Sequence, residues 1–368
     1  MDVQTFLDHI GDLTDLELAV VLSLVAQHHC LIETPDEYQN DVASELALIV
    51  RDMFHLSYII INQHDLQSVD KFVPAILDDT SELGDLPNES DDGLESGGAL
   101  HSKLASVSFR APSSNQVEQA KLDSRRVVNV VIAKDFNLAN EEVQIQALEL
   151  IRRRRIFSRT TVHTVPKVFL LLPIITTSTK HTRLNRHLND RIFMSHHHGP
   201  DEEFPNLEEF EQANLADDQS TYSDSNSPSV RREQLLATRR IDEKLIDQLR
   251  AQGQATTITP EIRRYLQDVV AFLRMERGVD GGVTPYATTL FLALSKYLAP
   301  FHGVDYVTPS LIALAAKKIY PHRLVIASPH RERSTQYGTD VATARDLLRD
   351  LDAQTIIQNV LDTVQCPT

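Results

Sequence analysis

The fold is decided by residues 127–151, which read VVNVVIAKDFNLANEEVQIQALELI. Apart from Asn129, the run Val127–Ala133 is apolar and rich in β-branched residues, which is typical of a parallel strand buried on both faces. After a short polar turn, Glu141–Arg154 has its apolar residues at helical spacing and predicts an amphipathic helix. A buried strand followed by such a helix favours an α/β domain with a parallel sheet.

The same alternation surrounds this stretch. Two further segments predict helices, Leu16–Val25 and Val42–Phe54. Three short apolar or β-branched segments predict strands, namely His29–Glu33, Leu56–Asn62 and Val168–Ile175.

The C-terminal part has helical patterns only. The segments are Arg232–Gln252, Pro260–Glu276, Tyr286–Ala299, Pro309–Ile319 and Leu347–Val364. Three of them are entered through Thr-Pro, with Thr259, Thr284 and Thr308 as expected N-caps and proline at the first helical position. We therefore expect an α/β domain followed by an all-α domain.

Two acidic stretches account for the formal net charge of −16 of the 368 residues. Asp78–Glu95 has eight acidic residues and Asp201–Asp224 has nine, both without Lys or Arg. Such composition favours disorder. The rest of the chain is about neutral, so the sequence does not indicate a basic nucleic-acid-binding surface over the whole protein. The expected division is an α/β domain at 14–196 with a disordered acidic insertion at 78–118, an acidic linker at 197–230, a helical domain at 231–328, and a tail with one helix at 329–368.

Composition also limits the compartment and the chemistry. The two cysteines, Cys30 and Cys366, have no metal-ligand or disulfide partner spacing, and neither has a credible catalytic setting. No apolar run approaches the roughly 18–20 residues of a membrane span, and the N-terminus has acids where a signal peptide needs basic residues. We expect a soluble intracellular protein, either nuclear or cytoplasmic, with no membrane partner.

A family resemblance begins at Asp135–Ile151. This segment resembles the one that follows the Walker B strand in AAA+ ATPases of the magnesium-chelatase and MoxR type. In the same order, Pro166–Thr177 resembles the strand leading to sensor 1, and Leu184–Ile192 resembles the segment that carries the arginine finger. Glu261–Leu324 is similar to the helical lid of that group. The resemblance implies an AAA+-like parallel sheet domain followed by an all-α lid.

A second set of residues resembles a fungal family of telomere-capping maintenance proteins, often grouped with magnesium chelatase subunits. It comprises Arg263–Tyr265, Gly281–Val283, Tyr306–Ser310 and Tyr337–Asp340. This resemblance implies a link to telomere capping.

The resemblance also places the nucleotide site, whose phosphate-binding loop would be Thr34–Asp41. A working loop needs glycines, a lysine on the phosphates and a hydroxyl on Mg²⁺. This loop has no glycine; Asn40 stands at the lysine position and Asp41 at the hydroxyl position. With Asp36 and Glu37 it presents three acids to a polyanionic phosphate tail, which should repel ATP.

The other nucleotide-site positions are altered as well. Lys134 stands at the position of the metal-binding aspartate and Asp135 at that of the water-activating glutamate. Thr176 or Thr177 would replace the sensor 1 asparagine, and Tyr286 the sensor 2 arginine. Only Arg191 matches as an arginine finger. We therefore expect no catalytic residues, no bound metal and no cofactor; ATP and Mg²⁺ belong only to the alternative of a working ATPase.

A cluster of arginines is the main candidate for interaction: Arg152, Arg153, Arg154, Arg155 and Arg159. At a helix C-terminus these side chains complement the helix dipole, which is the plainest interpretation. An acidic protein partner and, less favoured, a nucleic-acid backbone are the alternatives.

The histidine pairs have structural interpretations too. His196-His197-His198 resembles a metal-binding tract, but with no second ligand cluster we expect the start of a solvated loop. His28 and His29 are expected to be polar residues at a helix end. Ser195 is not part of a catalytic triad, because no nucleophile elbow is present.

Two functions remain. The first is a non-catalytic AAA+-like scaffold or adaptor with a protein partner, an active AAA+ subunit being one option; it would not form a homohexamer by itself. The second is a magnesium-chelatase- or MoxR-type ATPase that inserts a metal or remodels a partner, or that supplies only Arg191 to an active neighbour. Nucleic-acid binding through Arg152–Arg155 is a weaker third.

Overall fold

The centre of the molecule is a five-stranded sheet in which all neighbouring strands are parallel. The computed structural model describes residues 3–78, 125–158, 161–179, 182–217 and 240–367. In order across the sheet the strands are β2 (Tyr58–Ile61), β5 (Val130–Lys134), β8 (Leu170–Thr176), β1 (His29–Thr34) and β9 (Ile192–His197). The parallel α/β sheet predicted from the sequence is confirmed, and β9 is a strand that the sequence patterns missed.

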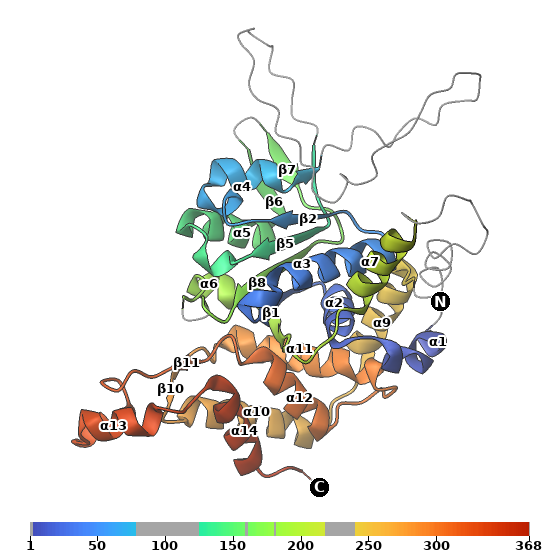
Figure 1. Ribbon diagram of the computed structural model, residues 1–368. Helices are drawn as coiled ribbons and strands as arrows, with labels where there is room; N and C mark the ends of the chain where they lie inside the picture. The colour runs from blue at the N-terminus through green and yellow to red at the C-terminus, as the bar shows by residue number, and fades with distance from the viewer. Residues whose placement is uncertain (1–2, 79–124, 159–160, 180–181, 218–239, 368) are drawn as a thin grey trace, which may run out of the picture.

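The helices cover both faces of this sheet (Figure 1). Val130 and Ile132 of β5 pack on the face covered by α2 (Asp15–Ala26) and α3 (Gln39–Leu48), and α3 continues as a π-helical turn over Ile49–Met53. Val131 and Ala133 point to the other face, which is covered by α4 (Val69–Ala75) and α5 (Glu141–Arg153). This two-sided burial explains why the strand consists of apolar residues without alternation.

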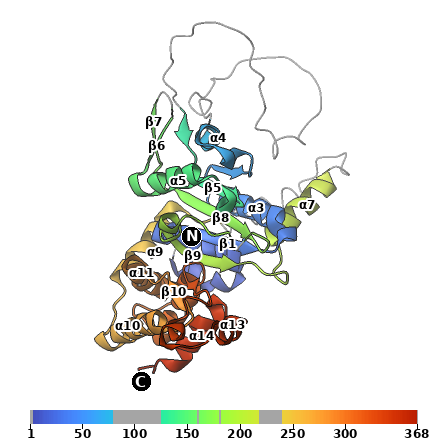
Figure 2. The same cartoon turned by 90° about the vertical axis from the view of Figure 1, so that its left-hand side faces the viewer.

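A helical domain lies against the face covered by α2 (Figures 1 and 2). Its helices are α9 (Glu243–Ala255), α10 (Pro260–Met275), α11 (Pro285–Phe301) and α12 (Pro309–Ile319). The three threonine N-caps are confirmed: Thr259, Thr284 and Thr308 each accept a hydrogen bond from a first-turn backbone N–H. Because α2 packs on both α9 and α11, one core is shared between the sheet domain and the helical domain.

Smaller elements complete the described residues. The short helices are α1 (Val3–Asp8), α6 (Arg186–Asn189) and 3-10 turns at Ile10–Asp12, Asp36–Tyr38, Asp65–Gln67, Phe136–Leu138 and Arg333–Tyr337. Three antiparallel pairs are formed by β3 (Leu77–Asp78) with β4 (Arg126–Val127), β6 (Arg155–Phe157) with β7 (Val162–Thr164), and β10 (Val279–Gly281) with β11 (Val325–Ile326). None of the helices in this part of the chain is long and apolar enough to cross a membrane.

The expected acidic linker at 197–230 contains a helix, α7 (Pro205–Asp217), which packs on α3. Two buried carboxylates hold its start. Glu45 accepts hydrogen bonds from the backbone N–H groups of Asn206 (3.2 Å) and Leu207 (2.8 Å), and Glu17 accepts one from the Asn206 side chain (3.0 Å). They satisfy free N–H groups of the first turn and complement the helix dipole. The prediction of a linker was wrong here because these anchors are distant in sequence; residues 79–118 and 218–230 lie outside the described part.

The helix predicted at Leu347–Val364 corresponds mainly to the last helix of the chain's described part, and its first two residues end a separate helix before it. The structure has α13 (Val341–Leu348) and α14 (Ala353–Thr363). Asp352 caps the second helix, since its side chain accepts a hydrogen bond from the Thr355 backbone N–H at 2.6 Å. An aspartate at this position favours a new helix start over continuation of the old helix.

Candidate functional site

The site expected from the sequence lies at the carboxyl ends of the three central strands. Thr34, Lys134 and Thr176 end β1, β5 and β8, which are neighbours in the sheet. Ligands of open α/β sheets bind at this edge. The structure therefore brings together most of the residues that the family resemblance assigned to a nucleotide.

The phosphate-loop position is occupied by an internal contact. Lys134 Nζ donates a hydrogen bond to Asn40 Oδ1 at 3.0 Å, which joins the end of β5 to the start of α3. Partial burial lowers the pKa of Lys134, and the nearby charge of Asp135 opposes this change. Asp41 follows in the first turn of α3 and adds a carboxylate.

Asp135 is also held by neighbouring side chains. Its backbone is left-handed (φ 49°), and its Oδ1 accepts hydrogen bonds from the hydroxyls of Thr176 and Thr179, both at 3.3 Å. Left-handed backbone at a residue other than glycine costs free energy and is found at functional sites. Thr177, the other sensor 1 candidate, instead donates its backbone N–H to the Thr34 carbonyl at 3.1 Å.

The acidic loop after β1 contacts the loop after β8. Asp36 Oδ1 accepts a hydrogen bond from the Ser178 backbone N–H at 3.1 Å. That bond lowers the pKa of Asp36, so this carboxylate is charged at neutral pH. A negative charge therefore stands at the edge where a phosphate tail would have to enter.

The arginine-finger candidate lies against the helical domain. The guanidinium of Arg191 stacks over the ring of Tyr286, with 4.2 Å from its carbon to the ring centroid. Beside it, the Thr284 hydroxyl donates a hydrogen bond to Asp190 Oδ1 at 2.6 Å. Arg191 and Tyr286 thus meet within one chain, and the contact is of the cation–π type.

The arginine cluster serves several local purposes. Arg153 forms an ion pair with Glu149 at 2.7 Å, and Arg155 lies over the Phe157 ring at 5.6 Å. Arg154 ends α5 in a left-handed conformation (φ 53°), and its Nη2 donates to the carbonyls of Pro166 (2.6 Å) and Lys167 (2.7 Å). Arg152 is exposed, and Arg159 lies outside the described residues. Arg154 therefore has a folding role that the sequence did not indicate.

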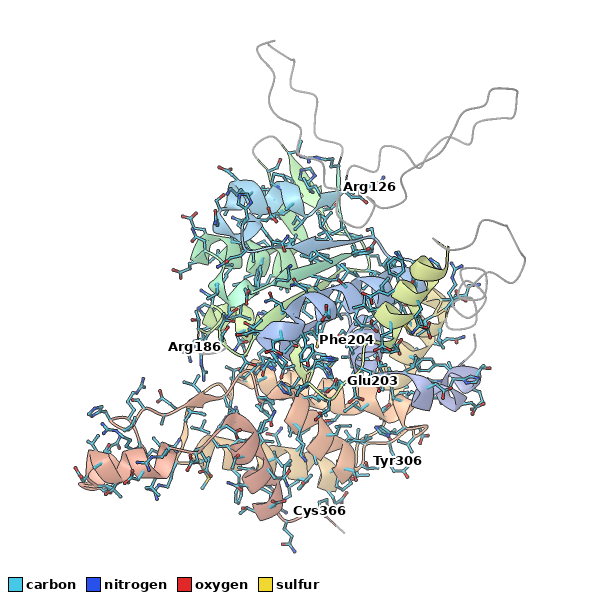
Figure 3. The ribbon with its side chains drawn as sticks, viewed as in Figure 1. Arg126, Arg186, Glu203, Phe204, Tyr306 and Cys366 are labelled. Atoms are coloured by element: carbon cyan, nitrogen blue, oxygen red, sulfur yellow. The ribbon has the colours of Figure 1, made fainter. Side chains whose placement is uncertain are left out.

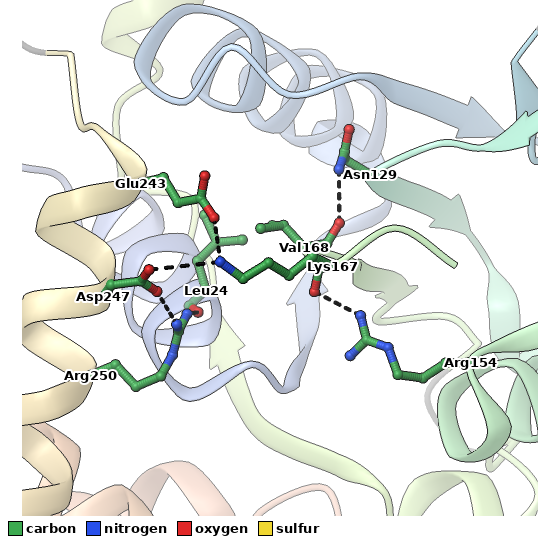
Figure 4. Close-up of polar contacts among 8 residues, drawn as sticks. All are labelled: Leu24, Asn129, Arg154, Lys167, Val168, Glu243, Asp247 and Arg250. Atoms are coloured by element: carbon green, nitrogen blue, oxygen red, sulfur yellow. Dashed lines mark hydrogen bonds and ion pairs between the residues drawn. The ribbon is translucent and has the colours of Figure 1, made fainter. Parts of the chain in front are cut away.

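A cavity of about 290 Å³ lies where β8 begins, at the opposite edge of the sheet from the nucleotide-site residues. Figure 4 shows its charged groups: Lys167 Nζ lies 2.7 Å from Glu243 and 3.8 Å from Asp247 of α9. Arg250 pairs with Asp247 and donates to the Leu24 carbonyl at 3.0 Å. The charged groups of the cavity are thus paired with one another and not free for a ligand. We interpret the cavity as a packing gap between the sheet and α9.

The histidine tract is not a solvated loop start, and that expectation was wrong. Residues up to His197 continue β9, which pairs with β1; His196 and His198 are buried, whereas His197 is exposed. Burial lowers the pKa of His198. Burial alone would raise the pKa of Glu202, but contacts with His196, the Gly199 N–H and His198 outweigh it and lower that pKa to about 2.

The remaining candidates have structural surroundings. His28 stacks on Phe193 (4.8 Å between centroids), and His29 begins β1, where its Nδ1 accepts a hydrogen bond from the Leu171 N–H at 3.0 Å. Cys30 is buried, and burial raises the pKa of its thiol to about 12. Ser195 donates to the Lys318 carbonyl at 3.4 Å.

Arg323 is the residue with the largest structural role that sequence reasoning missed. It follows α12 and is 3% exposed. Its guanidinium donates to the carbonyls of Ile192, Phe193 (3.2 Å), Asp190 (3.3 Å) and Ile319 (2.6 Å). Arg323 thereby joins the helical domain to β9. The sequence placed it only within Glu261–Leu324, the segment that resembles the lid.

Comparisons with known proteins agree with this architecture. Residues 271–346 match the model of the AAA lid domain. A crystal structure of a candidate ATPase from Cytophaga hutchinsonii superposes with a TM-score of 0.56 at 15% identity, covering 100% of this chain and 95% of that one. At this identity the likeness concerns the fold.

The curated relatives are fungal. Maintenance of telomere capping protein 2 of Eremothecium gossypii is 34% identical over 101 residues, and that of Kluyveromyces lactis is 28% identical over 96 residues. These matches cover 26% and 25% of this chain, and 36% and 35% of the relatives. The chain therefore spans about a third of the length of the curated relatives it matches. It has an AAA-type fold with an AAA lid domain, and a quarter of it is related to the fungal maintenance of telomere capping proteins 2.

Proposed function

We propose that this AAA-type chain is a non-catalytic scaffold that binds a protein partner in telomere capping. The single observation that carries the non-catalytic part is the hydrogen bond between Lys134 and Asn40. It pairs the two side chains that stand at the positions of the phosphate-binding lysine and the metal-binding aspartate. The telomere link is supported by the relatives' printed names.

The chemistry of the surrounding residues supports the same proposal. A phosphate site needs backbone N–H groups and cations aimed at the anion. Here Asp36 already accepts the Ser178 N–H, and Asp135 is engaged by threonine hydroxyls. Lys134 is paired with an amide oxygen and stands where a metal ligand would have to be. The loop after β1 thus has a structural role: its side chains bond to residues that follow or end β5 and β8.

The alternative is a magnesium-chelatase- or MoxR-type ATPase, or a subunit that supplies Arg191 to an active neighbour. Arg191 would first have to leave the ring of Tyr286, which lies in its own chain. No cofactor is therefore part of the proposal, and ATP with Mg²⁺ enters only under this alternative.

Isothermal titration of the full chain with ATP and Mg²⁺ should give no measurable binding. A dissociation constant at or below about 100 μM, equivalent to roughly −5.5 kcal/mol, would contradict the proposal. The variant Asn40→Lys is the matched test of the loop. It should not restore binding, because the glycines and the Mg²⁺ ligands are still missing.

For the partner surface we propose Arg152, Arg153 and Arg155 at the end of α5, with an acidic protein as the partner. Replacing these three with alanine, and keeping Arg154, should change the melting temperature little, since exposed charges contribute about 0–1 kcal/mol each. Recovery of the main partner from the protein's own cells should fall, and the remaining binding should depend less on salt.

The control carries alanine at Arg264, Arg345 and Arg349, which are exposed arginines on α10, on α13 and just after α13. Partner recovery with this control should match the unmodified chain. If the variant lacking Arg152, Arg153 and Arg155 recovers as much partner as the unmodified chain, these arginines are not the partner surface. Light scattering should give a mass below that of a homohexamer in the absence of nucleotide.

A further inference from the structure

The turn between β9 and α7 holds an unusual set of polar side chains. His196 belongs to β9 and His198 follows its last residue, still bonded to β1 through its backbone N–H. Both imidazoles are 2% exposed. Glu202 lies in the turn that follows. Figure 3 shows this turn, with Glu203 and Phe204 labelled, where the sheet domain meets the helical domain.

Three ring nitrogens in this set have no hydrogen-bond partner. They are Nε2 of His196 and both Nδ1 and Nε2 of His198. Glu202 Oε2 is near, at 3.5 Å from His196 Nε2 and 3.0 Å from His198 Nδ1, but neither contact has the angle of a hydrogen bond. Buried polar atoms are nearly always satisfied, so unpaired nitrogens in one place point to a missing ligand.

The donor atoms also lie close enough together to approach one metal ion. One donor atom from each of the three side chains lies within 4.8 Å of the others. A tetrahedral zinc ion with bonds of about 2.0–2.2 Å holds its ligand atoms roughly 3.3 Å apart. The two nitrogen–oxygen distances, 3.0 and 3.5 Å, fall on either side of this value.

We propose that His196, His198 and Glu202 bind one zinc ion that closes the turn between β9 and α7. Two imidazoles and a carboxylate are ligands that zinc accepts, with a water molecule completing the tetrahedron. The ion and the water can enter beside Glu202, whose side chain is 35% exposed. Phe204 covers the other side, with its ring centroid 4.7 Å from that of His198.

One neighbour opposes the metal. Lys318 Nζ of α12 lies 3.5 Å from His196 Nδ1. Zinc bound at Nε2 requires the proton on Nδ1, so the lysine must turn away from this nitrogen. Its positive charge also repels the ion. We therefore expect affinity in the micromolar range, weaker than that of a site without such a cation.

The test uses the full chain without an affinity tag, stripped of metal by dialysis against a chelator. Zinc is titrated in competition with a chromophoric chelator, and cobalt is added separately to record its visible spectrum. One zinc ion per chain should bind, Mg²⁺ should not compete, and cobalt should give the absorption of a tetrahedral site. Zinc should also raise the melting temperature.

Matched variants separate this site from other histidines. Glu202→Gln keeps the shape of the side chain and should weaken zinc binding at least tenfold, as should His198→Asn. His197→Asn, a change of the exposed neighbour, should leave it unaltered. The melting temperature without zinc shows whether each variant is folded, and Glu202→Gln remains decisive if His198→Asn unfolds. The proposal fails if the unmodified chain binds no zinc, or if Glu202→Gln binds it as tightly.

Discussion

Replacing Arg323 with alanine should lower the free energy of unfolding by about 4 kcal/mol. The guanidinium is buried and donates to four carbonyls, of which Ile192 and Phe193 lie in β9 and Ile319 lies in α12. Burial lowers its pKa to about 10, so it remains charged at neutral pH. Alanine would leave these carbonyls without donors inside the protein and would leave a cavity.

Urea unfolding followed by circular dichroism measures this change. Arg331→Ala is the control, because Arg331 forms an ion pair with Asp280 at 3.1 Å but its side chain is 70% exposed. It should cost about 0–1 kcal/mol. Arg323→Lys should recover only part of the loss, since an ammonium group cannot reproduce the planar fork of donors. Equal losses for Arg323→Ala and Arg331→Ala would show that the buried guanidinium does not hold the two domains together.

Replacing Gly282 with alanine should cost about 3 kcal/mol or more. Gly282 has φ +101°, which side chains rarely adopt, and an added Cβ would lie 2.1 Å from the Arg323 carbonyl oxygen. The clash is with backbone, so a side-chain rotation cannot relieve it. Gly282 and the backbone of Arg323 therefore lie against each other in the fold, although they are far apart in the sequence.

The neighbouring glycine provides the control for this prediction. A Cβ added at Gly281 has no atom within 4 Å, and its backbone needs no positive φ. Gly281→Ala should change the free energy of unfolding by less than about 1 kcal/mol, in either direction. Thermal and urea unfolding of both variants give the comparison, and a loss in Gly281→Ala as large as in Gly282→Ala would contradict the steric argument.

The sequence predicted those elements whose causes are local. The run Val127–Ala133 predicted a buried strand, because apolar residues on both faces need cover on both faces. The strand β5 covers Val130–Lys134, whereas Val127 belongs to β4. Thr259, Thr284 and Thr308 marked three helix starts because a cap and the following proline act within one turn.

Elements held by distant residues were missed. The start of α7 depends on Glu17 and Glu45, which are far away in the chain, and local composition gave only acidity. Strand β9 has three apolar residues followed by Ser and His, and its position is set by pairing with β1. Local patterns contain no information of this kind.

The candidate site was predicted in part. Family resemblance assigned Thr34, Lys134, Asp135 and Thr176 to one site, and the strand order puts the ends of β5, β8 and β1 side by side. The resemblance could not show that the Lys134 side chain bonds to Asn40, because this contact depends on the distance between the end of β5 and the start of α3. The carbonyl contacts of Arg154 and Arg323 were equally hidden, since main-chain acceptors have no sequence signature.

The contacts of Arg323 also bear on how quickly a partner can bind. Its acceptors are main-chain carbonyls, which do not titrate in the physiological pH range. Three of them belong to β9 and α12, and the fourth, that of Asp190, lies in the turn before β9. These bonds hold the lid to the sheet, and we expect the proposed partner binding to need no opening of this joint. We expect association at the rate of a rigid-body encounter, about 10⁵–10⁷ per molar per second, tuned by surface charge and ionic strength.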